Sequence, residues 1–263
     1  MTRILSGLVL LVVVIGTIWF LPPMVTVFLA MSVATQAFVE YAGLAGALGA
    51  AVPRMLTGTA VAAACFVIGS QFVPPTVVLL TALLAVGAVA VAGGAPGPGV
   101  LISAAASLFP IVYIGMPLGA LAAIHLLAGR EALLLLAATI IVSDSAQYYS
   151  GRAFGRRLLA PAISPKKTVE GAVGGVLCGT LAMTVAGLRV FPATHPLLLA
   201  LVAATVVLFG IVGDLFESLL KRGAGVKDSA ALIPGHGGVL DRIDSWLFAA
   251  PVYYVFVLYL QAR

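Results

Sequence analysis

The segment from Ser218 to Asp244 holds many groups that could do chemistry, inside a chain that is otherwise mostly hydrocarbon. Placing charges of both signs beside a bilayer costs free energy, so we expect a ligand that rewards both signs. A metal-bound polyphosphate is such a ligand, because carboxylates hold the divalent ion while Lys and Arg contact phosphate oxygens. Besides the hydroxyl of Ser218, the segment supplies Asp228, His236, Asp241 and Asp244 against the cations Lys221, Arg222, Lys227 and Arg242.

A second set of polar residues leads into this segment. Asp214, Glu217, Ser218 and Lys221 are three or four residues apart, a spacing that places them on one face of a helix. Asp214 lies deeper in the apolar run, where an ionised carboxylate without a partner is costly. We therefore predict that Asp214 is a metal ligand. For Glu217, an ion pair with Lys221 explains the spacing equally well.

Two carboxylates, Asp241 and Asp244, open the last apolar run, where the dipole of a helix favours anions. Helix capping alone would account for one of them. Together with Asp214 they suit a Mg²⁺ site, since this ion takes a few carboxylates, waters and substrate phosphates. The preceding Gly237 and Gly238 give a backbone that can approach a phosphate closely.

The sequence S-P-K-K-T at 164–168 forms a third cluster. Ser164 suits an N-cap and Pro165 the first position of a helix, so a helix is predicted to start here. The free N–H groups of such a start attract anions. Lys166 and Lys167 would oppose the helix dipole, which favours a bound anionic substrate; anchoring of the loop at the inner membrane surface is the alternative.

The remaining candidate is Asp144, near the end of an apolar run. An acidic residue inside a membrane span is by default a functional candidate, and we assign Asp144 to substrate binding. A structural ion pair with Arg152 explains it equally well. His125 and His195 lie apart from these clusters and are expected at the surface or at an interface.

Membrane helices must position these groups. The chain is 62% hydrophobic and 9% charged, whereas about a quarter of the residues of a soluble domain are charged. The piece at 118–128 is too short to span and is predicted to be interfacial or re-entrant. We predict an all-α, polytopic transmembrane bundle with two polar loops and about nine spans, near residues 4–20, 24–40, 55–72, 76–93, 100–117, 131–149, 171–190, 197–219 and 245–262.

The positive charges predict how the chain is oriented. With the N-terminus inside, eleven of the fourteen Lys and Arg residues fall on the inner side, leaving Arg130, Arg189 and Arg263 outside. The two polar loops, near 150–170 and 220–244, then face the cytoplasm. The net charge of +5 is attributed to these loops and to anionic lipid headgroups, and no nucleic-acid partner is expected.

The acidic residues divide the chain by function. Seven of the nine lie between Asp144 and Asp244, so residues 1–130 are predicted to be a transmembrane scaffold and residues 131–263 the catalytic region. Both parts are expected to form one integral membrane unit. The first apolar run follows Arg3 and lacks a small-residue cleavage site, which predicts a retained span and no cleaved signal peptide.

At these residues the chain resembles the phosphatidate cytidylyltransferases, also called CDP-diacylglycerol synthases. Their signature has the form S-x-hydrophobic-K-R-x4-K-D, a short spacer, P-x-H-G-G, a hydrophobic residue, x, and D-R-x-D, and residues 218–244 meet every fixed position. The S-P-K-K-T-x-E-G at 164–171 is also similar to the family pattern. Gln147 departs from the D-x-x-A-Y pattern of many relatives, which weakens the transfer of a role to Tyr148 more than to Asp144.

The resemblance implies a reaction in which CTP and phosphatidate give CDP-diacylglycerol and pyrophosphate, with Mg²⁺ and a second, monovalent cation such as K⁺. It implies a cytoplasmic active site, as in a bacterial inner membrane, and leaves a homodimer open. Besides the metal ligands Asp214, Asp241 and Asp244, it places two groups in the site: Ser218, Lys221, Arg222, Lys227, Asp228, His236 and Arg242 as catalytic, and Asp144, Ser164, Lys166, Lys167, Gly237 and Gly238 as substrate-binding.

Two other functions fit part of the pattern. A CTP-dependent lipid or polyprenol kinase would use the same ligands but transfer the terminal phosphate. An ion-coupled secondary transporter would use Asp144 and Asp214 to relay ions, with paired broken helices in two halves. The charges cluster at one predicted face and no two-half symmetry is visible, which favours the transferase.

Overall fold

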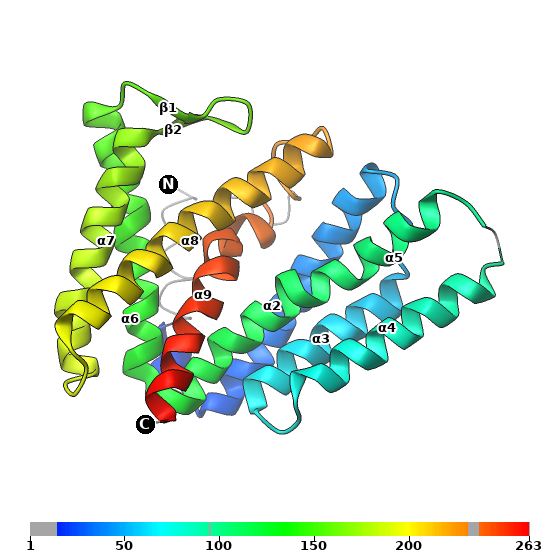
Figure 1. The fold of residues 1–263 in the computed structure, drawn as a ribbon, viewed down its shortest axis with the longest axis horizontal. Helices are drawn as coiled ribbons and strands as arrows, with labels where there is room; N and C mark the ends of the chain where they lie inside the picture. The colour runs from blue at the N-terminus through cyan, green and yellow to red at the C-terminus, as the bar shows by residue number, and fades with distance from the viewer. Residues whose placement is uncertain (1–14, 95, 231–236, 263) are drawn as a thin grey trace. The chain divides into compact units, whose positions relative to one another are not determined.

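The computed structural model describes residues 15–94, 96–230 and 237–262, which form helices and one short hairpin (Figure 1). Proline marks the starts of the first helices, since two of them begin at Pro23 and Pro75 and a third follows Pro53. In chain order the elements are α2 (Pro23–Ala47), α3 (Arg54–Ser70), α4 (Pro75–Ala92), α5 (Gly99–Pro110), the π-helical turn η1 (Ile111–Gly115), α6 (Met116–Phe154), β1 (Leu158–Ala160), β2 (Ser164–Thr168), α7 (Val169–Val190), α8 (Pro196–Gly223) and α9 (Leu240–Gln261).

Six helical stretches of the described residues are long and apolar enough to cross a membrane, so the protein is a multi-pass membrane protein. The predicted count of nine is not confirmed. The helix α3 has only 17 residues, and most of the predicted span 4–20 lies outside the described residues. The six stretches are α2, α4, the continuous stretch Gly99–Phe154, α7, α8 and α9.

The predicted spans 100–117 and 131–149 lie in one helical stretch, Gly99–Phe154. Residues 118–128 are not a separate short piece, because they continue the helix and most of them are buried. Their interfacial or re-entrant placement stays a prediction. A straight helix of 56 residues would measure about 84 Å, far more than one crossing needs. The stretch is interrupted at Gly129, whose φ of 81° and ψ of 175° are not helical.

The described residues divide into two compact units. The first unit contains those of Met1–Leu126 and Leu220–Ile243, and the second unit those of Leu127–Leu219 and Asp244–Arg263. Most of the signature segment therefore belongs with the N-terminal helices. The functional division into residues 1–130 and 131–263 stays a prediction.

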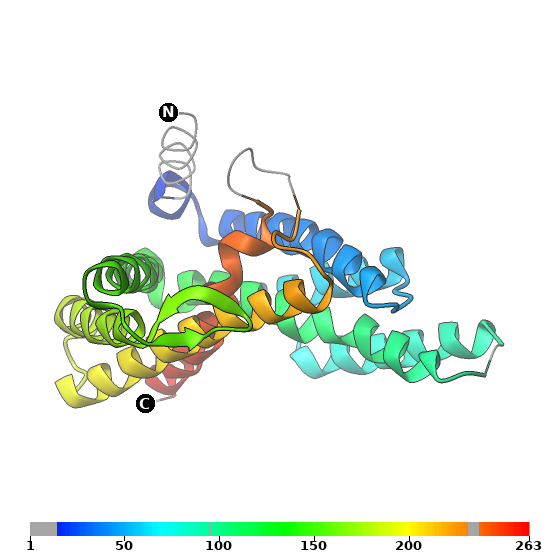
Figure 2. The same ribbon diagram turned by 90° about the horizontal axis from the view of Figure 1, so that it is seen from above.

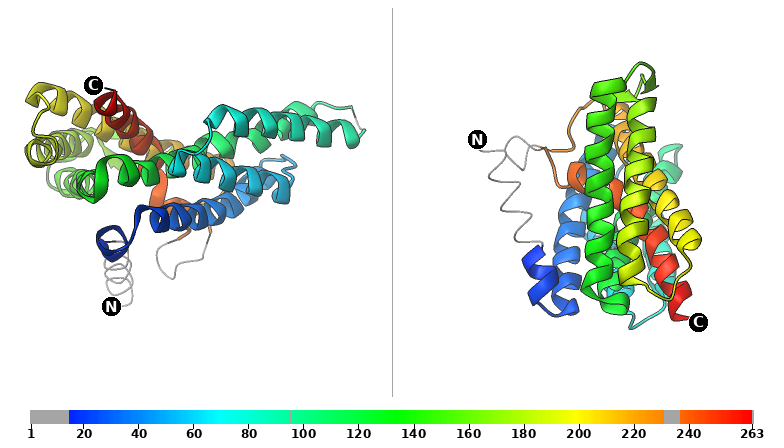
Figure 3. Two further views of the ribbon diagram at one scale, coloured as in Figure 1. Left: turned by 90° about the horizontal axis from the view of Figure 1, so that it is seen from below. Right: turned by 90° about the vertical axis from the view of Figure 1, so that its left-hand side faces the viewer.

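In the first unit, α2 to α5 and the start of α6 pack lengthwise (Figures 1 and 3). Small residues allow this close approach. A Cβ added to Gly115 would lie 2.6 Å from the carbonyl oxygen of Val61, and one added to Gly119 would lie 2.7 Å from that of Cys65. The two backbones are therefore too close to leave room for a side chain at either glycine. Buried apolar side chains of α2 and α3, such as Val27, fill the space around this contact.

In the second unit, α7 lies alongside α6 (Figure 3). The buried face of α7 is almost free of side chains, because its members recur every four residues as Gly171, Gly175, Gly179, Met183 and Gly187. The opposite face carries exposed apolar residues such as Leu177 and Leu181, as a lipid-facing surface does. The hairpin of β1 and β2 leads directly into α7 (Figure 2).

Candidate functional site

The signature segment begins at the C-terminal end of α8, which closes with two characteristic backbone bonds. Val226 N–H donates to the Lys221 carbonyl at 2.9 Å, and Gly225 N–H donates to that of Arg222 at 3.1 Å. Gly225 has a φ of 72°, the left-handed conformation that this helix ending requires. The ending leaves Lys221 buried, while the side chains of Arg222 and Lys227 are exposed.

Lys221 forms a buried ion pair with Asp241 at 2.5 Å, with side chains only 10% and 6% exposed. The second oxygen of Asp241 accepts hydrogen bonds from Gly238 N at 2.7 Å, Ser229 N at 3.0 Å and Ser229 Oγ at 2.9 Å. Such a carboxylate is tolerated in a buried position because its charge and its lone pairs are satisfied. Asp241 thus holds the two ends of the segment 229–238 together.

A third charged group, Glu40 of α2, completes this cluster in the first unit and is 5% exposed. Its Oε1 accepts from Val239 N at 2.8 Å, and its Oε2 accepts from Leu240 N at 2.9 Å and from Ser229 Oγ at 2.8 Å. The first N–H groups of a helix have no partner within that helix. Glu40 therefore caps the start of α9 from another part of the chain.

Glycine is required next to this cluster for steric reasons. Gly237 has a φ of 79°, and a Cβ added there would lie 2.6 Å from Asp241 Oδ2. A Cβ on Gly238 would collide with both Glu40 and Ser229. The two glycines were predicted to let backbone approach phosphate; in the structure they let backbone approach carboxylates.

In the second unit, Lys167 forms an ion pair with Asp214 of α8. Asp144 of α6 lies within electrostatic range of both, and its Oδ1 accepts a hydrogen bond from Gln147 Nε2 at 3.0 Å. Lys167 and Asp214 are partly exposed, at 23% and 28% of their side chains. Two carboxylates and a lysine from three separate elements are therefore neighbours at a place that solvent or a ligand can reach.

Lys167 reaches this place from a strand, so the predicted helix start at Ser164 is wrong. Residues 164–168 form β2, antiparallel to β1, and α7 begins only at Val169. Thr168 is its N-cap, accepting from Gly171 N at 3.1 Å. The hairpin is also tied at its base by Glu170, which accepts from the backbone N–H groups of the two residues before β1, at 3.0 and 3.2 Å.

Asp244 lies where α8 and α9 touch in the second unit. A Cβ added to Gly213 would lie 2.6 Å from the Asp244 carbonyl oxygen. The Asp244 side chain accepts from Ser245 N at 2.7 Å. A small cavity between α6, α8 and α9 is lined by Ser143, Asp144, Gly210 and Ser245, among others.

The predicted metal ligands are divided between the two units. Asp214 and Asp244 belong to the second unit, whereas Asp241 belongs to the first. Within the described residues, no group of three or more His, Cys, Asp or Glu side chains is arranged to hold a metal ion. The ligand set of Asp214, Asp241 and Asp244 stays a prediction.

Several other residues can now be placed. The alternative ion pair of Asp144 with Arg152 does not form among the described residues. Both residues lie on α6, and the eight positions between them correspond to about 12 Å along the helix. Glu217 is fully buried and Ser218 half-buried, while Asp228 and Arg242 are exposed. The predicted catalytic residue His236 lies outside the described residues.

The two other histidines differ from each other. His195 is exposed, as expected, and its Nδ1 accepts from Leu197 N at 3.2 Å. His125 was also expected at a surface or interface, and this is wrong. It is 5% exposed in the core of the first unit, where its Nδ1 lies 2.8 Å from Thr26 Oγ1. The apolar setting of residues 118–128 in the helix accounts for its burial.

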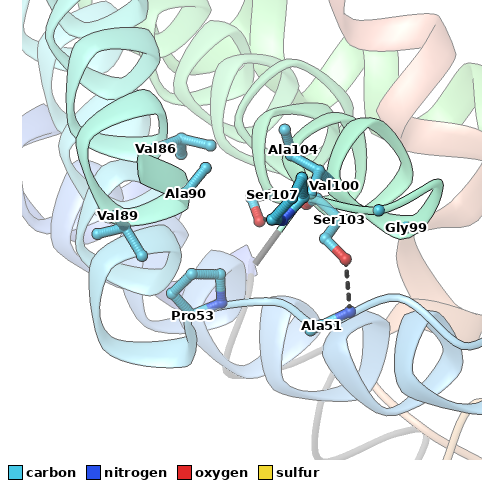
Figure 4. Close-up of a pocket in the computed structure, with 12 residues that line it drawn as sticks. Ala51, Pro53, Val86, Val89, Ala90, Gly99, Val100, Ser103, Ala104 and Ser107 are labelled. Carbon is cyan, nitrogen blue, oxygen red and sulfur yellow. Dashed lines mark hydrogen bonds between the residues drawn. The ribbon is translucent and has the colours of Figure 1, made fainter. Parts of the chain in front are cut away.

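A larger cavity of about 400 Å³ in the first unit is separate from these charged groups (Figure 4). It is lined mainly by small apolar residues of α4 and α5, together with Pro53. Its polar groups are serine hydroxyls, and Ser103 Oγ accepts from Ala51 N at 3.0 Å. Lacking charged groups in its lining, this cavity is unsuited to a polyphosphate.

Residues 1–260 match the model of the Cytidylyltransferase family. The chain belongs to this family. It is similar to proteins named phosphatidate cytidylyltransferase from Pseudomonas aeruginosa (47% identity over 123 residues, 46% of this chain and 45% of the relative) and Bacillus subtilis (45% over 112 residues, 43% and 42%). An Escherichia coli relative, "Uncharacterized protein YnbB", is 45% identical over 134 residues, 50% of this chain and 44% of the relative. The chain thus spans less than half the length of these relatives.

Sequence reasoning missed two members of the cluster around Asp241. Ser229 lies inside the signature segment but was not selected, and Glu40 was assigned to the scaffold. One signal for Glu40 was available, since it is one of only two acidic residues outside the interval 144–244 and it stands in an apolar run. A buried carboxylate there needs donors, and unpaired N–H groups at a helix start are natural ones.

Proposed function

We propose that the protein is a phosphatidate cytidylyltransferase, converting CTP and phosphatidate into CDP-diacylglycerol and pyrophosphate. The observation that carries the proposal is membership of the cytidylyltransferase family together with the complete signature at 218–244. Support comes from the names of relatives such as those of Pseudomonas aeruginosa and Bacillus subtilis. In the first unit, Asp241 joins Lys221, Ser229 and Gly238, which lie in separate parts of this signature.

The reaction needs positioning and charge neutralisation more than proton transfer. An oxygen of the phosphatidate phosphate attacks the α-phosphorus of CTP, and the bond between that phosphorus and the bridging oxygen to the β-phosphate breaks. The nucleophile is already an anion, so no strong general base is required. The electron pair leaves with pyrophosphate, whose growing charge must be stabilised, as in other phosphoryl-transfer sites.

The exposed cations of the signature suit this task. Arg222, Lys227 and Arg242 are exposed and would meet triphosphate oxygens, the contacts that Arg and Lys make best. Lys221 is buried in its ion pair with Asp241, so it would contact the ligand while still paired with that carboxylate. In the second unit, Lys166 and Lys167 on the hairpin would hold an anionic headgroup or the nucleotide.

The carboxylates of the second unit suit a divalent ion. Asp144 and Asp214 come from different helices, lie within electrostatic range of each other and offer hard oxygen ligands. Mg²⁺ needs only one or two carboxylates when waters and substrate phosphates complete its shell. When bound there, Mg²⁺ would neutralise phosphate charge and favour the departure of pyrophosphate. Lys167 would have to yield Asp214 or share it with the ion.

The test is an assay of purified protein with phosphatidate in detergent micelles or vesicles. We expect lipid product with CTP but not with ATP or GTP, release of pyrophosphate, and loss of turnover with EDTA that Mg²⁺ restores. Glu131→Gln, at an exposed acidic position, should retain parental turnover. Release of CDP in place of pyrophosphate would show a CTP-dependent kinase, and absence of any CTP-dependent product would refute the proposal.

A further inference from the structure

We infer that Glu40 is a positioning residue for the reaction, acting through the signature segment and not on the substrates. This inference rests on the proposed function for its kinetic part and on the contacts of the first unit for its structural part. Glu40 lies 189 to 200 residues away from its partners in the sequence, yet both of its oxygens are engaged by them.

The contacts explain why a carboxylate stands at this position. Val239 and Leu240 present N–H groups at the start of α9, where the helix dipole is positive. A carboxylate accepts with both oxygens, whereas a glutamine has a single acceptor oxygen and would turn an NH₂ group toward a donor. Replacing Glu40 by Gln therefore keeps the volume but must break at least one of the three hydrogen bonds.

Ser229 transmits the position of Glu40 to Asp241. Its hydroxyl is 2.8 Å from Glu40 Oε2 and 2.9 Å from Asp241 Oδ2, and its single proton serves one of them at a time. Ser229 N also donates to Asp241 at 3.0 Å. Glu40, Ser229 and Asp241 thus form one chain of contacts that ends at Lys221, a fixed position of the signature.

The same chain of contacts gives a steric reason for Gly238. A Cβ on Gly238 would collide with Glu40 and Ser229 together, so the backbone comes as close to the two side chains as it can. Gly238 N is at the same time held by Asp241 at 2.7 Å. The backbone of residues 237–241 is therefore held by two carboxylates, Asp241 and Glu40.

The experiment compares Glu40→Gln with Thr26→Val, which removes another buried polar contact of the same helix, the one with His125. Both variants are expected to lower the apparent Tm. At a temperature where both are folded, Glu40→Gln should lose at least about tenfold in kcat with CTP and phosphatidate, the scale of one broken buried hydrogen bond to a charged group. Thr26→Val should stay within about twofold of the parent.

Hydrogen exchange gives a second measurement that needs no activity. Amides in peptides covering 237–243 should exchange at least about tenfold faster in Glu40→Gln and unchanged in Thr26→Val. The inference requires both the exchange change and the kcat change; either without the other overturns it. Ser229→Ala combined with Glu40→Gln should cost less than the sum of the single effects, because the two residues share a bond.

The two proposals fail separately. A parent protein without CTP-dependent lipid product refutes the proposed function, and exchange at 237–243 then still decides whether Glu40 holds this segment. An active parent with an equally active Glu40→Gln variant refutes only the positioning role.

Discussion

Asp241 and Lys221 show what burial demands of single residues here. Two unit charges in a setting that excludes water are stable only when paired and hydrogen-bonded, and breaking such a pair costs about 3–5 kcal/mol. The cluster meets this demand with three donors to Asp241 and two to Glu40, and with the Ser229 hydroxyl shared between the two carboxylates. Its members therefore have little freedom to be exchanged, even for isosteric residues.

Asp241→Asn tests this at the site itself. The amide keeps one acceptor oxygen and places an NH₂ group toward either Lys221 or the donors of Ser229 and Gly238. We expect turnover to fall about 100-fold or more, the scale of losing a central electrostatic contact. Steady-state kinetics on folded, membrane-inserted protein measures the loss, with Glu131→Gln as the control. Near-parental turnover would contradict both the predicted place of Asp241 among the metal ligands and its structural role.

Residue types and spacing predicted much of this cluster but not its partners. Asp241, Lys221 and the two glycines could be selected because the signature keeps them within 27 residues. The pairing of Lys221 with Asp241, and of Lys167 with Asp214, depends on how elements pack. Glu40 could not be assigned by spacing at all, since its partners lie about 200 positions away.

At the scale of elements, the hairpin shows where a local signal misleads. Ser-Pro is typical of a helix start, but Pro165 is equally compatible with an edge strand, which has no ladder bond to lose there. Thr168 offers a competing N-cap four residues later, and Glu170 in the first turn suits the dipole. The helix therefore starts after the lysines, which leaves Lys167 on a strand beside Asp214.

The glycine face of α7 allows a matched test of packing. A Cβ on Gly171 would lie 2.7 Å from the Gln147 carbonyl oxygen, while one on Gly187 would meet only side-chain atoms at 3.5 Å or more. Gly→Ala gains about 1 kcal/mol of helix propensity, against about 1–3 kcal/mol for overpacking. We expect Gly171→Ala to lower the apparent Tm in detergent and Gly187→Ala to leave it unchanged or raise it.

The contrast between the two glycine variants is the informative quantity. Both change the same residue type on the same buried face of one helix, so differences in expression or detergent affect them alike. Equal shifts for both would contradict the close contact of α7 with α6. A selective loss of activity in Gly171→Ala would add that this contact positions Asp144, which lies one turn before Gln147 on α6.

At the scale of the whole molecule, composition was sufficient for the class and insufficient for the count of spans. The high hydrophobic and low charged fractions predicted an all-α multi-pass membrane protein, and six stretches of the described residues support it. The continuation of one helix through residues 118–128 was not predictable, because a helix can run through an apolar stretch of any length. Gly129, where the stretch does break, stands directly before Arg130 and Glu131, the first charged residues after Arg54, and the predicted span 131–149 begins there.

Orientation is the last property that the charge pattern predicts, and it can be measured directly. In a variant with Cys65 and Cys178 replaced by Ser, single cysteines at Ala162, in the hairpin turn, and at Val226 should both react with an impermeant maleimide only from the cytoplasmic side. A cysteine at Ala193, between α7 and α8, should react only from the other side. Labelling of 162 and 226 from opposite sides would contradict a common face for the two polar loops, and with it a single catalytic face.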